Sequence, residues 1–341
     1  MATSTPWTGI VVRCNLGETG SVPRNASANS PDIIMAGTKP LEDPSILTNP
    51  DNYNNPYSNQ LYIKQPNYLY VRGKNFTGGD LSGTWNLFWS TPNILLYPYL
   101  WQENQLGTSA GDQNPPFTIK ADKIGASEDC FFWVPPDTAD HYCMIAVANT
   151  PDHGNPILGV NNISSLAEVL ATNANIAQRN VQMIRGNPPS LVTNASYNQG
   201  AEGSTVDLTV VFHNLPKGSS YTVSSGTPLN GKTLSHSDTN TQDNDFKYAW
   251  TGLEIPANWN TIFTFSVNFG PDWSGIPPTA HPAFEIRGEL VTNSDHPLYH
   301  LGQIADLDKP PAQRRVSPGG GPVKVLIAGS VTIQCPDVKK K

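Results

Sequence analysis

Short stretches in which apolar and polar residues alternate recur along the chain. Residues 85–89 place large apolar side chains at every second position, and residues 261–269 do the same over a longer run. The opposite side of that longer run carries Thr264, Ser266 and Asn268. A period of two is typical of a β-strand with one buried and one solvated face. These runs therefore predict strands with an aromatic inner face and a polar outer face.

Similar runs occur throughout the chain, separated by pairs of Gly or Pro residues at the spacing of a β-sandwich. Further strands are predicted at residues 9–14, 31–35, 68–72, 130–134, 142–147, 179–184, 204–213, 220–225, 246–250, 283–291 and 323–334. One short helix is predicted, because Ser165 and Glu168 form a capping box ahead of the apolar residues 169–171.

The predicted strands group into two domains. Residues 1–60 have little periodicity and are predicted to form an extended N-terminal arm that packs on the first domain or on a neighbouring molecule. Residues 61–186 form the first β-sandwich, and Asn187-Pro-Pro189 marks its end. Residues 190–341 form the second β-sandwich, which ends in a solvated Lys tail at 339–341. The predicted fold class is all-β, with two tandem β-sandwich domains and an N-terminal arm.

The first sandwich contains short motifs in a characteristic order. They are Leu69-Tyr-Val-Arg72 followed by Asn75, Leu87-Phe-Trp-Ser90, Trp133-x-Pro135, His141-Tyr-Cys143 and Asn175-Ile-Ala-Gln-Arg-Asn180. With them the region resembles a family of bacterial immunoglobulin-like domains of the adhesion type, found on secreted enzymes and surface proteins. The resemblance implies an immunoglobulin-like sandwich that acts as a spacer or binding module, and it implies no reaction. The second half resembles no family in this way.

The composition changes the picture at the surface. Only 14% of the residues are charged, and 21 Lys and Arg stand against 28 Asp and Glu, for a net charge of −7; soluble domains average about 25% charged residues. The surface must therefore be built mainly from Asn, Ser, Thr and Gln. Sparse acidic charge excludes an electrostatic footprint for nucleic acid. No apolar run reaches the roughly 18 residues of a transmembrane helix.

The ends of the chain and its cysteines bear on the compartment. The N-terminus has neither a basic nor an apolar segment of the secretory type, which predicts a cytoplasmic protein or export by a route without a signal peptide. Four cysteines are too few for a disulfide scaffold. Cys130 and Cys143 flank a Pro-Pro-Asp turn, so they are either a disulfide across a hairpin or two buried thiols. Cys14 and Cys335 are expected to be inert.

The sequence contains no motif that we connect with catalysis. It has no nucleophile elbow, no phosphate-binding loop and no dinucleotide fingerprint. His296 and His300 have the spacing of a zinc pair on a helix, but Pro297 argues against a helix there. We therefore expect a protein that is not an enzyme and has no catalytic residue or cofactor, with calcium as the one candidate ion.

The candidate calcium ligands lie in one acidic segment. Asp238, Asn240, Asp243 and Asp245 supply oxygen atoms at closely spaced positions, without the Gly and the downstream Glu of an EF-hand. The segment is either a flexible acidic loop or a loop stabilised by calcium.

Aromatic residues in amide-rich and proline-rich segments are the candidate binding residues. Tyr97, Tyr99 and Trp101 form one group, and Trp259 and Trp273 form another. Such residues stack on sugars or anchor protein interfaces. Alternatively, they close the open ends of the sandwiches as part of the core.

Three hypotheses for function follow. The first is a non-enzymatic structural or binding protein that assembles with copies of itself or with a partner protein through neutral, amide-rich surfaces, because low charge favours association. The second is a carbohydrate-binding module or lectin, with or without calcium. The third is a secreted bacterial toxin or effector component.

Overall fold

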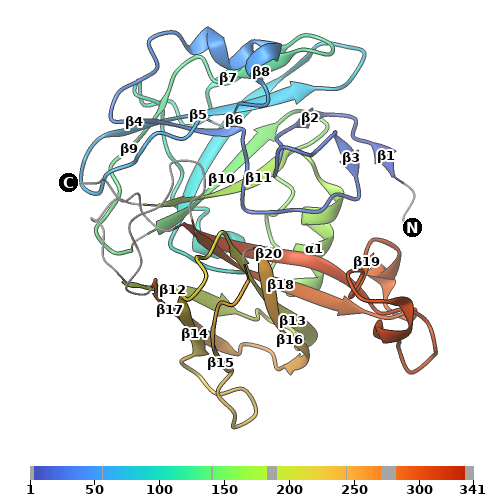
Figure 1. The fold of residues 1–341 in the computed structure, drawn as a ribbon. Helices are drawn as coiled ribbons and strands as arrows, with labels where there is room; N and C mark the ends of the chain where they lie inside the picture. Colours follow the sequence, from blue (N-terminus) through green and yellow to red (C-terminus); the bar gives the residue numbers. More distant parts are fainter. Residues whose placement is uncertain are drawn as a thin grey trace. The chain divides into compact units, whose positions relative to one another are not determined.

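The computed structural model describes residues 4–55, 57–139, 141–182, 190–242, 244–269 and 282–334. Strands dominate these residues, and one α-helix, α1 (Ile163–Thr172), lies among them (Figure 1). The prediction of an all-β fold is therefore confirmed. Short 3₁₀ turns span Pro44–Thr48, Pro50–Asn52, Pro98–Leu100, Pro297–His300 and Pro311–Gln313.

The chain divides into two compact units, and each unit is discontinuous in sequence. Unit 1 comprises Met1–Thr91, Leu96–Val160 and Glu168–Ile184. Unit 2 comprises Pro92–Leu95, Asn161–Ala167 and Arg185–Lys341. Two short segments from the first half of the chain thus belong to the second unit, which differs from the contiguous ranges 61–186 and 190–341. The predicted boundary at 187–189 lies outside the described residues.

Unit 1 contains two main sheets and a small ribbon. The first sheet has the order β11 (Ile176–Gln182), β10 (His141–Asn149), β6 (Leu81–Ser90) and β7 (Pro116–Ile119). The second is built around β5 (Asn67–Asn75), which pairs with β2 (Ile10–Val11), β4 (Ile33–Gly37), β8 (Ile124–Ala126) and β9 (Phe131–Trp133). The ribbon pairs β1 (Thr5–Pro6) with β3 (Ser21–Val22). All these pairings are antiparallel.

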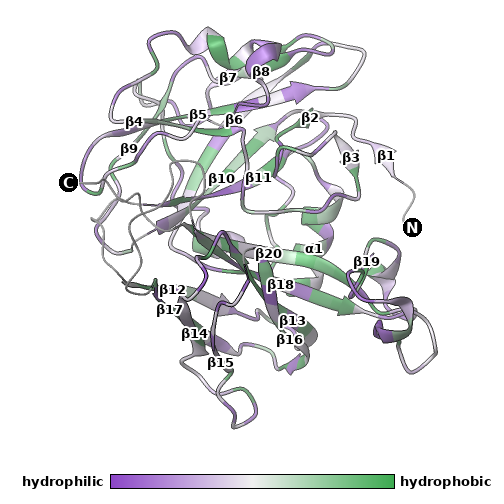
Figure 2. Cartoon of the chain, viewed as in Figure 1, coloured by the Kyte–Doolittle hydropathy of each residue, from purple (hydrophilic) through white to green (hydrophobic). Residues whose placement is uncertain are grey.

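The core of unit 1 lies between its two main sheets. Residues 143–148 of β10 are apolar without interruption, as expected for a strand buried on both faces (Figure 2). The Trp133 ring of β9 lies 5.2 Å from the Tyr142 ring of β10, which links the two sheets. The predicted N-terminal arm is part of this unit, because Ile10 and Ile33 are buried in the same core.

Unit 2 also contains two antiparallel sheets (Figure 1). The first has the order β12 (Ser190–Asn198), β17 (Asn260–Asn268), β14 (Ser220–Ser225) and β15 (Ser235–Thr239). The second has the order β16 (Phe246–Ile255), β13 (Ser204–His213), β18 (Ala283–Thr292), β20 (Lys324–Gln334) and β19 (Gln303–Ile304).

An aromatic core joins the two sheets of unit 2. Phe265 of β17 stacks on Phe284 of β18 with ring centroids 6.0 Å apart, and Phe284 also lies 6.0 Å from Phe212 of β13. Phe263 and Val267 of β17 are buried as well. The alternation in residues 261–269 therefore predicted the inner face of β17 correctly.

The segment Pro92–Leu95 completes unit 2. The amide of Ile94 donates to the carbonyl of Ser196 on β12 at 2.8 Å. On the other side, the carbonyl oxygen of Ile94 lies 2.0 Å from the place that a Cβ atom at Gly329 would take. Only glycine fits at this position, because any side chain would collide with the backbone. Gly288, which pairs with Gly329, lies against the same segment.

One local prediction needs correction, and one open alternative is decided. The helix begins at Ile163, two residues before the predicted capping residue Ser165. The Asn162 side chain acts as the cap, because it accepts from the amide of Ser165 at 2.9 Å. Of the two alternatives for Cys130 and Cys143, the structure shows two buried thiols and no disulfide between them. They do not face each other across a hairpin, because β9 pairs with β5 whereas β10 pairs with β6 and β11.

Candidate functional site

The outward side of the sheet β12-β17-β14-β15 carries no charged side chain among the described residues. We call this surface the uncharged face. It consists of Val192, Asn194, Ser196 and Asn198 of β12, Asn260, Ile262, Thr264, Ser266 and Asn268 of β17, Ser220, Thr222 and Ser224 of β14, and Ser235, Ser237 and Thr239 of β15. In a chain of net charge −7, a four-strand surface without ionisable groups is a distinctive feature.

Side chains of neighbouring strands are linked by hydrogen bonds on this face. The Thr222 and Ser237 hydroxyl oxygens lie 2.8 Å apart between β14 and β15. The Thr264 hydroxyl donates to the Asn194 Oδ1 at 2.9 Å between β17 and β12. The second bond fixes the orientation of the Asn194 amide and leaves its Nδ2 group available to donate to a ligand or to water. The face therefore presents oriented donors and acceptors.

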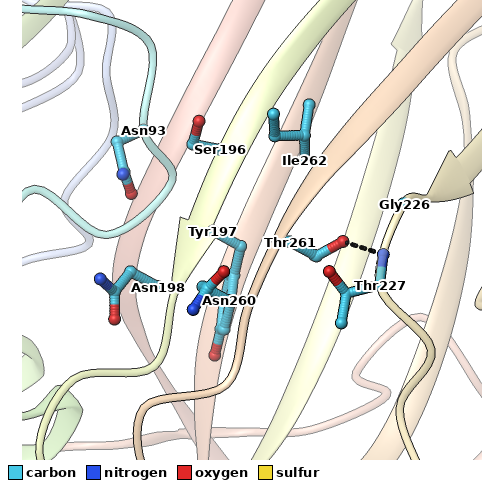
Figure 3. Close-up of a pocket in the computed structure, with 9 residues that line it drawn as sticks. All are labelled: Asn93, Ser196, Tyr197, Asn198, Gly226, Thr227, Asn260, Thr261 and Ile262. Carbon is cyan, nitrogen blue, oxygen red and sulfur yellow. Dashed lines mark hydrogen bonds between the residues drawn. The ribbon is translucent and has the colours of Figure 1, made fainter.

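A pocket lies at one end of the uncharged face, with a volume of about 420 Å³ (Figure 3). Its lining comes from two strands, a loop and the inserted segment. The lining residues are Asn93, Ser196, Tyr197, Asn198, Gly226, Thr227, Asn260, Thr261 and Ile262. All are uncharged at neutral pH, and most carry an amide or a hydroxyl group. Ile262 supplies an apolar patch and is 53% exposed.

Local hydrogen bonds orient the amides of the pocket. The Asn93 Oδ1 accepts from the Leu95 amide at 3.2 Å, and the Asn198 Oδ1 accepts from the Gly200 amide at 3.0 Å. The Asn260 Nδ2 donates to the Asn258 carbonyl at 3.3 Å. Within the described residues, the Nδ2 groups of Asn93 and Asn198 and the Oδ1 of Asn260 have no protein partner. The pocket therefore offers two fixed donors and one fixed acceptor to a ligand or to water.

The wall of the pocket behind these amides is held by hydrogen bonds and a ring contact. The buried Tyr197 hydroxyl donates to the Gln199 Oε1 at 2.6 Å. The Trp259 ring lies 5.6 Å from the Tyr197 ring, and its Nε1 donates to the Pro228 carbonyl at 3.2 Å. The Thr261 hydroxyl accepts from the Thr227 amide at 2.9 Å, which holds the loop after β14 against β17. Such a pocket is formed before any ligand binds, which lowers the entropic cost of binding.

The structure places the aromatic candidates in different environments. Tyr97 and Trp101 are buried, and the Trp101 Nε1 donates to the Leu96 carbonyl at 3.1 Å, as expected for core residues. Tyr99 stacks on Tyr97 and is 51% exposed. Trp259 is buried at 9% exposure and supports the pocket from behind. Trp273 lies outside the described residues.

Three of the four candidate calcium ligands lie within the described residues, and their side chains bond to protein groups. Asp238 lies on β15 rather than in a loop. The Asn240 side chain donates to the Leu215 carbonyl and accepts from the Gln242 amide. Asp245 bonds to His213, and Asp243 lies outside the described residues. In the part of the chain that the structure describes, no three His, Cys, Asp or Glu side chains gather as metal ligands.

The clearest titratable cluster lies on the other sheet of unit 2. The His213 Nδ1 lies 2.7 Å from the Asp245 Oδ2, and its Nε2 lies 3.7 Å from the Glu285 Oε2. The nearby carboxylate of Glu285 raises the pKa of His213 above its ordinary value, and Asp245 raises it further. Arg287 donates to Glu285 at 2.7 Å. Despite its burial, Glu285 has its pKa lowered to about 2 by His213 and Arg287. A histidine between two carboxylates keeps its proton, so this arrangement suits an ion-pair network rather than a general base.

Sequence reasoning missed most of the pocket. Strands β12 and β15 were not predicted, because their outward positions are Ser, Thr and Asn, which are typical of turns. A signal was present in residues 192–198, where Asn194, Ser196 and Asn198 alternate with residues that are buried. Asn93 has no such signal, because it reaches the site only through the insertion of its segment into unit 2.

Comparison with known proteins adds little to this geometry. No family model and no curated protein matches the chain. Among solved structures, red sea bream transglutaminase is similar at 12% identity and a TM-score of 0.23, with 67% of this chain and 28% of that chain covered. An allantoicase is similar at 10% identity and a TM-score of 0.17, with 59% and 77% covered. The chain thus spans under a third of the transglutaminase. Both similar proteins are enzymes by name, but at these scores the likeness carries no argument.

No helix within the described residues is long and apolar enough to cross a membrane.

Proposed function

We propose that this is a non-catalytic binding protein whose unit 2 recognises a neutral carbohydrate in the pocket at the end of the uncharged face. The observation that carries the proposal is the lining of that pocket, which is uncharged and rich in oriented amides and hydroxyls. Sugar hydroxyl groups both donate and accept hydrogen bonds, so they match Asn side chains that present both functions.

The pocket also discriminates against charged ligands. A carboxylate or ammonium group that enters it loses hydration, and no ionised side chain of the lining compensates. The volume of about 420 Å³ is within the usual range of small-molecule sites. Ile262 offers an apolar contact for the C–H surface of a sugar ring. A neutral saccharide therefore fits the lining better than an anion, a cation or an apolar ligand.

A glycan array with the full chain tests the proposal, with Asn198→Ala as the site variant and Asn244→Ala as the matched control. Asn244 is an exposed residue outside the pocket. We expect binding to neutral glycans and none to their sialylated or sulfated forms. Loss of one neutral hydrogen bond of about 1 kcal/mol in Asn198→Ala should weaken binding about fivefold. A uniformly blank array, or binding confined to acidic glycans, would refute the proposal.

Calcium dependence sharpens the same test. The lining contains no carboxylate, and calcium sites in proteins normally use several. We therefore expect the array signal to be unchanged by a chelator. A signal that a chelator abolishes would place recognition elsewhere, at a calcium-dependent site.

A second candidate function is assembly with copies of the same chain through the uncharged face. It is favoured by the net charge of −7, because two copies repel each other least where neither presents charge. Exposed Val192 and Ile262 add apolar area to that face. Sedimentation velocity of the full chain at high concentration should then show dimers or larger species, and a monomer at all concentrations would exclude this candidate.

A further inference from the structure

The pocket is continuous with a line of polar side chains that runs along two strands. β12 and β17 are paired in register, so that Asn198 is opposite Asn260 and Ser196 is opposite Ile262. These four residues line the pocket. Beyond them, Asn194 is opposite Thr264, and Val192 is opposite Ser266.

We propose that the carbohydrate is a linear neutral polymer, whose end lies in the pocket and whose following units lie along the outward side of β12 and β17 toward Asn194 and Thr264. The inference rests on the proposed function and extends it from a small sugar to a chain. Outward residues on one strand follow each other at about 6.7 Å. The four pairs from Asn198 to Val192 thus cover about 20 Å, enough for several hexose units.

The chemistry of the line fits this occupant. The Thr264 hydroxyl donates to the Asn194 Oδ1 at 2.9 Å, which leaves the Asn194 Nδ2 and a lone pair of Thr264 for hydroxyl groups of a ligand. Val192 is 59% exposed and Ile262 is exposed as well, so apolar contacts flank the polar ones. No charged side chain interrupts the line from residue 192 to residue 198 or from 260 to 266, as a neutral chain requires.

The experiment compares short and long probes on the wild-type full chain by titration calorimetry. The probes are cello-, malto-, manno- and chito-oligosaccharides of two and six units. For the recognised class, each added hydrogen bond of ordinary strength raises affinity about fivefold, so the longer probe should bind at least that much more tightly. Equal affinity for both lengths would overturn the inference but leave the pocket proposal standing. Absence of binding by every probe would count against the proposed function itself.

Two lysine variants test where the carbohydrate polymer lies on the uncharged face. Thr264→Lys adds a bulky charged side chain to β17, opposite Asn194 of β12. A bound long probe would cover this ammonium without offering it an opposite charge, which is costly. We therefore expect the variant to bind the long probe about tenfold more weakly. Binding of the two-unit probe should not change. Ser237→Lys is the matched control, since Ser237 is exposed on the same face two strands away, on β15. It should bind both probes as the wild type does.

The same variants distinguish carbohydrate binding from self-association at the uncharged face. If both lysine variants shift an oligomer to monomer and neither changes affinity for the oligosaccharides, the uncharged face is a self-association surface and the inference is wrong. If both variants weaken binding of the long probe equally, the proposed position of the carbohydrate along β12 and β17 is wrong. Circular dichroism and thermal midpoints confirm that each variant is folded.

Discussion

Unit 1 and unit 2 both bury charged side chains, but they differ in what their other polar groups do. Unit 1 buries charge: Asp32 is enclosed with Arg13 and Arg72, at 3.0 Å or less from each guanidinium. Within the described residues, unit 2 places its ion pairs on the sheet that contains β13 and β18 and in the connection between β19 and β20, and it leaves the outward face of the other sheet uncharged. The buried charged groups of this cluster in unit 1 bond to one another, whereas amides in the pocket of unit 2 keep donors and acceptors for a ligand. This difference is the reason for placing function in unit 2.

The largest expected effect comes from breaking the buried charge cluster of unit 1. Asp32→Asn keeps the shape of the side chain but removes the only carboxylate bonded to Arg13 and Arg72 in the described residues. Two cations would remain buried without a counter-charge, which typically costs about 3 to 5 kcal/mol. Calorimetric unfolding should show this loss, and hydrogen exchange should locate it in unit 1.

A surface ion pair provides the control for that variant. Lys64 and Asp137 lie 2.9 Å apart with exposed side chains. Asp137→Asn should cost less than about 1 kcal/mol. If Asp32→Asn and Asp137→Asn lower the free energy of unfolding equally, the buried charge cluster is not what holds the N-terminal residues Arg13 and Asp32 in unit 1.

The next effect tests how unit 2 depends on its inserted segment. Gly329→Val forces a side chain onto the carbonyl oxygen of Ile94, which lies only 2.0 Å from where the new Cβ atom would be. Overpacking of this kind costs about 1 to 3 kcal/mol, and a collision with backbone belongs at the upper end. The variant should lower the thermal midpoint of unit 2 and weaken carbohydrate binding, because Asn93 belongs to the displaced segment.

Gly319→Ala is the matched control, since a Cβ atom there meets nothing within 4 Å. Stability that is unchanged in both variants would mean that the segment Pro92–Leu95 is not required for unit 2.

The two units also differ in how far the sequence predicts them. Strands with apolar inner faces were predicted in both, and β13 (Ser204–His213) and β14 (Ser220–Ser225) match their predicted bounds. The buried charge cluster was not predicted, because Arg13, Asp32 and Arg72 lie far apart in sequence and no local pattern marks their contact. The pocket was missed for a related reason: it combines strand residues that resemble turn residues with Asn93, which long-range topology alone brings there.

A smaller effect is expected from the ion pairs of unit 2 in acid. Glu285 has its pKa lowered to about 2 in the folded chain, compared with about 4.3 for an unperturbed Glu. Its contribution to stability is therefore complete above about pH 4.3 and is lost as the pH falls toward 2. Glu285→Gln should cost about 1.5 to 3 kcal/mol at about pH 6, the strength of hydrogen bonds to a charged group.

Thermal midpoints of wild type and Glu285→Gln, measured from about pH 6 to about pH 2.5, should converge as the solution becomes more acidic. Glu202→Gln, at an exposed position of the same unit, is the control and should follow the wild type throughout. A constant gap between wild type and Glu285→Gln would show that the loss is steric rather than electrostatic.

The smallest effect has the opposite dependence on pH. The pKa of His213 is raised by Glu285 and then by Asp245, so the stability from its charged form is complete below the unfolded value of about 6.5 and disappears as the pH rises through the folded value. Because the His213 side chain is 31% exposed, the contribution should stay below about 1 kcal/mol. His213→Gln should therefore lower the thermal midpoint at about pH 5.5 and match the wild type at about pH 9. His300→Gln, at an exposed position, is the control and should show no such trend with pH. Carbohydrate binding should be unchanged in both variants, because His213 and His300 lie outside the uncharged face of unit 2.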